Sequence, residues 1–150
     1  MIRKATVKDA QDIFKILQHY ALKGILLPRS LNSIYEHIRS FFVYEENGEI
    51  IGVGALHVFW EDLAEIKSLA VLEEHQHKGI GKQIVQECIK EAKELGVNKV
   101  FALTYVPDFF ERLGFKITDK SDFPQKVWME CIHCVKFNDC QEVPVSYIVE

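Results

Sequence analysis

The segment from residue 75 to residue 82 carries the residue types best suited to holding an anion: His75-Gln76-His77-Lys78-Gly79-Ile80-Gly81-Lys82. Apolar residues recur at helical spacing after it, so the two glycines stand where a helix begins. The first turn of a helix leaves backbone N–H groups unpaired, and glycine lets an anion approach them. Lys78 and Lys82 add positive charge, and the two histidines add a partial positive charge. The segment therefore predicts a site for a diphosphate.

Known nucleotide fingerprints do not fit this segment. The pattern GxxxxGK[ST] is absent, and GxGxxG fails because Ile84 stands at the third glycine position. Taken alone, a helix that begins in a basic loop is the alternative interpretation.

The four cysteines are the second group of residues that could carry chemistry. Cys88 falls on the apolar stripe of the helix that follows the glycines. Cys131, Cys134 and Cys140 could complete a Cys₃His zinc site with His133. Adjacent His133 and Cys134 are awkward as joint ligands, and a second C-x-x-C pair is absent. We therefore expect no metal and favour packing of these thiols in a core, with zinc binding and redox chemistry as open alternatives.

The elements that must position these groups alternate between strands and helices. Apolar, β-rich runs predict strands at residues 2–5, 41–44, 50–59, 63–72, 100–103 and 115–117, and an edge strand at 143–149 that tolerates its proline. Amphipathic spacing predicts helices at residues 6–24, 30–40, 79–96 and 107–114. The sequence thus predicts an α/β (α+β) fold with a mixed central β-sheet flanked by helices.

Local signals support the boundaries of these elements. Thr6 and Asp9 resemble a capping pair, and Ser30 can cap the second helix. The dipeptide Asn47-Gly48 between two apolar runs predicts a hairpin turn.

Composition narrows the function classes. The 150 residues predict a single domain, 1–150, with a cysteine-containing C-terminal extension from about residue 119. A net charge of −4 provides no overall positive field, so we expect neither nucleic acid nor an anionic membrane as partner. The first residues lack the apolar core of a secretory signal, and the longest apolar stretch, 50–60, is too short to span a bilayer. We therefore expect a cytoplasmic protein.

Two motifs in this order resemble the GNAT N-acetyltransferases. The first is Gln76-x-x-Gly79-x-Gly81 after a strand that ends Leu69-Ala70-Val71, and the second is the segment 109–115, about thirty residues later. The resemblance implies that acetyl-CoA is the co-substrate and that the loop binds its pyrophosphate. It implies cofactor contacts at Leu69, Val71, Gln76, His77, Lys78, Gly79, Ile80, Gly81 and Lys82.

Within this superfamily the chain is most similar to the acetyltransferase domain of the N-acetylglutamate synthases. The residues that carry this likeness are Leu27-Pro28-Arg29-Ser30, Ala64-Glu65-Ile66-Lys67-Ser68-Leu69-Ala70-Val71, Leu103-Thr104 and Lys126-x-Trp128-x-x-Cys131-x-x-Cys134. The likeness implies a role in arginine biosynthesis and glutamate as substrate, whose carboxylates need cationic partners. Arg29 and Lys67 are the candidates, against the alternatives of a surface arginine and a lysine snorkelling from a strand.

An acetyltransferase must also move protons. A free amine has to lose a proton before it attacks a thioester, and Glu65 is the candidate base, acting through a water. Strand alternation predicts that Glu65 shares a face with Lys67, Leu69 and Val71; the alternative is that it only pairs with Lys67.

The thiolate of CoA needs a donor in turn. Many GNAT enzymes place a tyrosine where this chain has Phe110. Thr104 and Tyr105 are the replacement candidates, and the resemblance favours Thr104.

Two other functions stay open at this point. One is acetylation of a different small amine or a peptide amine, and the other is acyl-CoA sensing without catalysis. A homodimer is open as an assembly.

Overall fold

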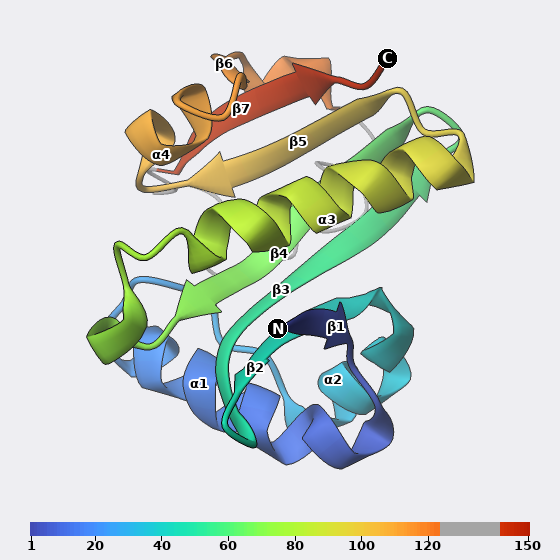
Figure 1. The fold of residues 1–150 in the computed structure, drawn as a ribbon. Helices are drawn as coiled ribbons and strands as arrows, with labels where there is room; N and C mark the ends of the chain where they lie inside the picture. The colour runs from blue at the N-terminus through green and yellow to red at the C-terminus, as the bar shows by residue number, and fades with distance from the viewer. Residues whose placement is uncertain (124–141) are drawn as a thin grey trace. The chain divides into compact units, whose positions relative to one another are not determined.

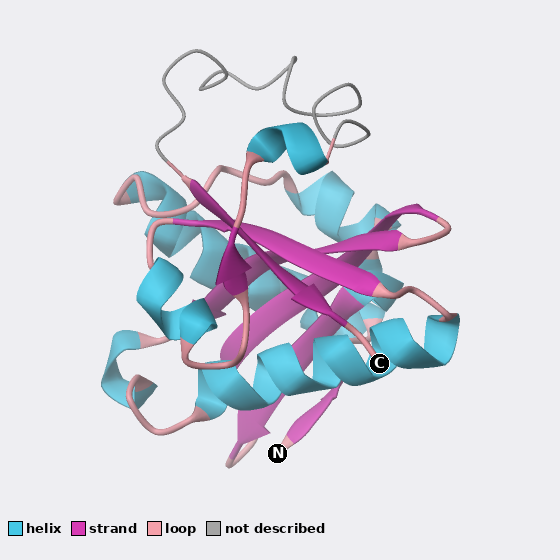
Figure 2. Cartoon of the chain, turned by 90° about the horizontal axis from the view of Figure 1, so that it is seen from above, coloured by secondary structure: helices cyan, strands magenta, loops and turns pink. Residues whose placement is uncertain are grey.

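The computed structural model describes residues 1–123 and 142–150, which are coloured in Figure 2. In these ranges, seven strands form a mixed sheet in the order β1-β2-β3-β4-β5-β7-β6. The chain divides into two compact units, Met1–His57 with Ile66–Glu91, and Val58–Glu65 with Ala92–Glu150. The predicted fold class, a mixed sheet flanked by helices, is confirmed.

The first unit contains the N-terminal helices and most of the long strands. Its elements are β1 (Ile2–Lys4), α1 (Ala10–Leu22), α2 (Leu31–Glu36), β2 (Phe41–Glu46), most of β3 (Glu49–Trp60), the second half of β4 (Leu63–Val71) and the first three turns of α3 (Ile80–Leu95). The predicted helix cap and the predicted hairpin turn are both present in this unit. Ser30 Oγ accepts the Ser33 N–H at 3.0 Å, and Asn47 and Gly48 turn the β2–β3 hairpin with φ of 53° and 78°.

The second predicted helix is shorter than expected. It ends at Glu36, and a 3₁₀ turn, Ile38–Ser40, completes the span that we predicted to reach residue 40.

Opposite faces of the first unit's strands carry different helices (Figure 1). Helices α1 and α2 pack on one face, where Ile13, Leu17 and Ile34 meet Val53 and other apolar side chains in a buried cluster. Helix α3 packs on the other face. A Cβ built on Gly52 would lie 3.0 Å from Ile80 Cγ2, and one on Gly54 would lie 2.5 Å from Ile84 Cγ2. The two glycines of β3 therefore let α3 approach the sheet closely.

The second unit is built around β5 (Lys99–Thr104). Residues Leu63–Glu65 of β4 pair with it in parallel on one side, and β7 (Val143–Ile148) pairs antiparallel on the other. The rings of Phe101 and Phe123 stack at 4.2 Å in a small core with Phe59 and Leu63. Helix α4 (Pro107–Glu111) and the short strand β6 (Lys116–Ile117) also belong to this unit.

The prediction that residues 143–149 form an edge strand is wrong, because β7 lies between β5 and β6. Pro144 is tolerated there for a local reason. Its carbonyl accepts the Thr118 N–H at 2.9 Å, and in a strand the nitrogen of a residue points to the same side as its carbonyl. The missing donor therefore faces the end of the two-residue strand β6, and the pairing with β5 loses nothing.

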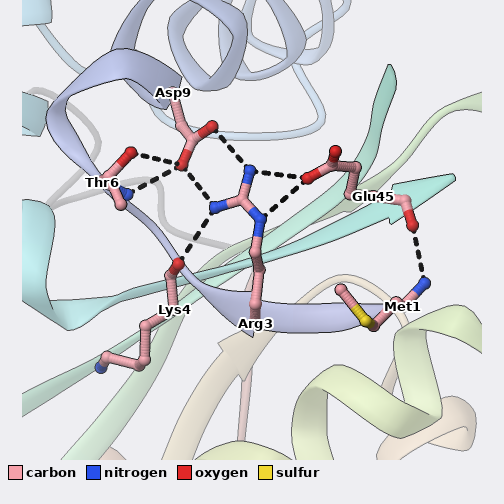
Figure 3. A network of polar contacts seen from close by, with 6 residues as sticks. All are labelled: Met1, Arg3, Lys4, Thr6, Asp9 and Glu45. Atoms are coloured by element: carbon pink, nitrogen blue, oxygen red, sulfur yellow. Dashed lines mark hydrogen bonds and ion pairs between the residues drawn. The ribbon is translucent and has the colours of Figure 1, made fainter. Parts of the chain in front are cut away.

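A polar network joins β1, β2 and the start of α1 (Figure 3). The Arg3 guanidinium donates to Asp9 through two nitrogens, at 2.8 and 3.0 Å, and its Nε donates to Glu45 at 2.8 Å. The Thr6 N–H donates to Asp9 Oδ2 at 2.8 Å, as the capping pair predicts. The hydrogen bond from Arg3 is the main reason that the pKa of Asp9 lies below its ordinary value.

We expect Asp9→Asn to lower the free energy of unfolding by about 1.5–3 kcal/mol at pH 7, because a charge-assisted pair with Arg3 is lost. The pKa of Asp9 is depressed on folding, so its contribution is present above the ordinary value of 3.8 and is lost as the pH falls through the folded-state pKa. Urea denaturation at pH 7 and at lower pH should show the difference between wild type and variant shrinking below about pH 4.

Lys4→Ala is the matched control. Its ammonium forms an ion pair with Glu91 at 2.9 Å, with 42% of the lysine side chain exposed, and a surface pair of this kind contributes little. Equal destabilisation by Asp9→Asn and Lys4→Ala, or a difference that does not depend on pH, would contradict this account of the network.

Candidate active site

The predicted anion loop forms a strained turn ahead of α3. His77 and Gly79 both have left-handed backbone, with φ of 64° and 83°. The Gln83 N–H donates to the Gly79 carbonyl at 3.1 Å and closes the first turn, so the N–H groups of Ile80, Gly81 and Lys82 have no partner within the helix. His77, Lys78 and Lys82 are exposed, whereas the Ile80 side chain is buried. Ile80 can therefore serve an anion only through its backbone.

The side chain of Gln76 is exposed but folds back onto the protein. Its amide Nε2 donates to the Val71 carbonyl at 2.9 Å and to the Tyr20 hydroxyl oxygen at 3.1 Å. The Tyr20 hydroxyl donates to the same Val71 carbonyl. This carbonyl already receives two donors, so we expect any contact between Val71 and the pantetheine to use its N–H.

Replacing Gly79 by Leu should weaken the binding of CoA at least about tenfold, since a charge-assisted hydrogen bond lost to the diphosphate costs that much or more. A Cβ at this position meets no atom within 4 Å, so the new side chain would occupy the space ahead of the helix. Calorimetric titration with CoA measures the change.

Gly96→Leu provides the control for backbone strain. Gly96 has the same φ of 83° and equally open surroundings, but it follows the C-terminal end of α3. Strain should be similar in the two variants, and only Gly79→Leu should lose affinity. Unchanged affinity in a folded Gly79→Leu protein would remove the loop from the cofactor site.

Arg29 lies in the α1–α2 connection and reaches β2 and β4. Its Nε donates to Ser33 Oγ at 3.1 Å, and its Nη1 donates to Ser68 Oγ at 3.3 Å. The guanidinium carbon stands 4.8 Å from the centre of the Phe41 ring. These contacts orient a planar cation beside the strand that carries Lys67, which is itself half-buried.

Ser68 interrupts the regular strand at this place. Its φ is 55°, a left-handed conformation that is uncommon for serine. Beyond it, Leu69 points toward α3, since its Cδ1 would stand 3.3 Å from a Cβ on Gly54, while Ala70 belongs to the cluster under α1 and α2. Side-chain alternation requires extended backbone, so the left-handed Ser68 ends the stretch over which alternation can place Glu65, Lys67, Leu69 and Val71 on one face.

Glu65 lies in the second unit and is a buried carboxylate, 4% exposed. It is in register with Phe101 of the neighbouring parallel strand, so the two side chains share a face. Thr104 is three residues further along β5, which places its side chain on the opposite face. The candidate base and the candidate proton donor thus lie on different sides of this pair of strands.

Thr104 is better placed to act as a donor than Tyr105. Its side chain is 7% exposed and its Oγ1 accepts the Val106 N–H at 2.9 Å, which orients the hydroxyl. Tyr105 is 41% exposed. Phe110, at the position of the missing tyrosine, is buried and its ring lies 5.1 Å from that of Phe115.

Cys88 is a core residue, fully buried in α3, and burial raises the pKa of its thiol. The predictions made for Cys131, His133, Cys134 and Cys140 lie outside the described residues. In the part of the chain that the structure describes, no helix is both long enough and apolar enough to cross a membrane.

Comparison with known proteins agrees with this geometry. Residues 10–115 match the model of the acetyltransferase (GNAT) family. An uncharacterized N-acetyltransferase of Chlorobaculum tepidum is 46% identical over 142 residues, which cover 95% of this chain and 92% of that protein. An amino-acid acetyltransferase of Mycobacterium tuberculosis is 33% identical over 151 residues, which cover 99% of this chain and 86% of the relative.

Among solved structures, the N-acetylglutamate synthase of Neisseria gonorrhoeae, complexed with coenzyme A and N-acetyl-glutamate, superposes with a TM-score of 0.89. It is 26% identical, and the match covers all of this chain and 35% of that one. The chain belongs to the GNAT acetyltransferase family. It is an acetyltransferase with acetyl-CoA as its co-substrate.

Proposed function

We propose that this enzyme transfers the acetyl group of acetyl-CoA to the α-amine of an acidic amino acid, with glutamate as the preferred acceptor and a role in arginine biosynthesis. The names of its relatives support an amino-acid substrate. The observation that carries the proposal further is the arginine oriented by Ser33, Ser68 and Phe41. We also propose that residues 1–150 act as one GNAT domain, extended from about residue 119.

Arg29 suits a carboxylate because its planar fork can donate two parallel hydrogen bonds to the two oxygens. Its surroundings support that role, since two serine hydroxyls and an aromatic ring hold the guanidinium in a defined plane. Lys67, one residue before Ser68 on β4, adds a second cation in the same stretch of sequence. We therefore assign Arg29 as the main carboxylate clamp and Lys67 as its helper.

The anion loop fits the diphosphate of CoA. The N–H groups of the first turn of α3 point out of the helix, and Lys78 and Lys82 provide exposed positive charge beside them. Bound acetyl-CoA supplies an activated acetyl thioester. The loop backbone and the backbone of Leu69 and Val71 on β4 bind acetyl-CoA and orient it.

Proton movement falls to the second unit. Glu65 accepts a proton from the substrate amine through a water, and Thr104 offers its hydroxyl to the departing sulfur. Both groups must reach the same carbonyl centre, and the pairing of β4 with β5 ends at Glu65 and Phe101, three residues before Thr104, so paired strands do not separate the two groups there. Tyr105 remains the second candidate for that donor.

The release of CoA from acetyl-CoA tests this function, measured separately with glutamate, aspartate, glutamine, lysine and a dipeptide. Glutamate should give the largest kcat/KM. A larger value with lysine or with the dipeptide would assign the enzyme to a different amine and refute the acidic substrate. CoA binding without turnover on any of the five would contradict the proposed catalytic activity and indicate a sensor.

A further inference from the structure

The last two turns of α1 contact the segment that leads into the anion loop. Tyr20 projects from α1, and its hydroxyl donates to the carbonyl of Val71 at the end of β4. Gln76 donates to this same carbonyl at 2.9 Å and to the Tyr20 oxygen at 3.1 Å. One hydroxyl therefore joins a helix, the end of a strand and Gln76 of the loop in a closed ring of hydrogen bonds. All three residues belong to the first unit.

The position of this ring matters because the loop backbone is strained just beyond it. His77 follows Gln76 directly and has left-handed backbone, and Gly79 repeats that conformation two residues later. A non-glycine residue holds such a conformation only where its surroundings determine it. The side chain of Gln76 supplies one such constraint, and the Tyr20 hydroxyl fixes the amide of Gln76 in turn.

Burial of Tyr20 distinguishes this contact from the other contact between α1 and the same segment. Tyr20 is 5% exposed, and burial raises the pKa of its hydroxyl, which therefore remains protonated and donating at neutral pH. A second contact joins the same helix to the same segment, since Glu73 accepts from His19 at 2.6 Å and from Lys23 at 3.0 Å. That contact is at the surface, where ion pairs contribute little. The buried hydroxyl is the stronger constraint.

We propose that Tyr20 is a positioning residue of the acetyl-CoA site, whose hydroxyl holds Gln76 and the end of β4 so that the loop N–H groups converge on the diphosphate. This inference rests on the proposed cofactor site at residues 76–82. Tyr20 acts through Gln76 and Val71 and does not itself touch the cofactor.

The test compares two acetyl donors. Tyr20→Phe removes the hydroxyl and keeps the ring, so we expect the KM for acetyl-CoA to rise about five- to tenfold, the effect of one hydrogen bond, with little change in kcat. S-acetyl-pantetheine carries the same thioester without the diphosphate. Its KM should rise much less, because this donor has no diphosphate for the loop to bind and Val71 keeps its hydrogen bond from Gln76.

Two further variants serve as a control and as an independent test of the network. Ile16→Val alters a buried residue of the same helix without touching the ring of hydrogen bonds, and it should leave the KM of both donors unchanged. Gln76→Met removes the other side chain of the ring and should reproduce the donor-specific effect of Tyr20→Phe. The double variant should lose much less than the product of the two single effects, because both residues act in one network.

The proposal is overturned if Tyr20→Phe leaves the KM for acetyl-CoA unchanged, or raises the KM of both donors equally. Gly79→Leu separates this failure from failure of the site itself. If Gly79→Leu weakens CoA binding and Tyr20→Phe does not, only the positioning role is lost. If neither does, the loop is not the cofactor site.

Discussion

Glu65→Gln should lower kcat by about 10²–10⁴ with glutamate as acceptor, while acetyl-CoA affinity and the fold are retained. The amide keeps the size of the carboxylate at this buried position on β4 but cannot accept the proton of the amine. The loss should be greatest where the free substrate amine is protonated. It should shrink as the pH rises above the pKa of that amine, because the substrate then arrives deprotonated. Steady-state rates across pH measure this profile.

A neighbouring carboxylate provides the comparison. Glu61, exposed in the turn before β4, has the same side chain without the burial, and Glu61→Gln should behave as wild type. A Glu65→Gln enzyme with wild-type rates at every pH would remove Glu65 from the mechanism. A loss that is constant across pH would also contradict a base and would indicate a structural role.

Arg29→Lys should reduce kcat/KM for glutamate about ten- to a hundredfold, which is the effect of losing one charge-assisted hydrogen bond. Lysine keeps the positive charge but loses the planar fork that matches a carboxylate. Neutral amines without a carboxylate should be affected little, and CoA affinity should not change. Kinetics on glutamate and on one such amine, with both variant and wild type, measure the difference.

Arg39→Lys is the matched control, because Arg39 is an exposed arginine in the 3₁₀ turn that follows α2. It should leave the kinetics unchanged. If Arg29→Lys reduces activity equally on every amine, Arg29 does not select the carboxylate, and the case for an acidic substrate fails.

The parts of the fold that could be predicted from sequence are those set by local chemistry. The capping pair Thr6–Asp9, the Ser30 cap and the Asn47-Gly48 turn each work over three or four residues, so their signals are readable in the chain. The anion loop is readable for the same reason, since two glycines and the following helix are contiguous.

The features that could not be predicted depend on segments far apart in the chain. The sequence predicts the strand at residues 115–117, but it does not indicate that this strand, β6, pairs with β7 and makes β7 an interior strand. The contact between Tyr20 and Val71 joins residues 51 positions apart. Each could be found only once the topology was known.

The left-handed backbone of Ser68 was missed for another reason. Glycine is the usual signal for positive φ, and nothing in the sequence marks a serine within an apolar strand as an interruption. The alternation rule therefore extended too far, from Glu65 to Val71. In the structure the Ser68 hydroxyl accepts a hydrogen bond from Arg29, a contact that cannot be read from the sequence.

The central claim is that the acceptor is the α-amine of glutamate, and a competition experiment tests it most directly. The intact chain is given isotopically labelled acetyl-CoA and an equimolar mixture of the twenty amino acids, and the labelled products are identified by mass spectrometry. At early times we expect the main labelled product to be N-acetylglutamate, with the labelled acetyl group attached to the α-nitrogen. Dominance of any other acetylated amino acid, or label spread evenly over many of them, would contradict the claim.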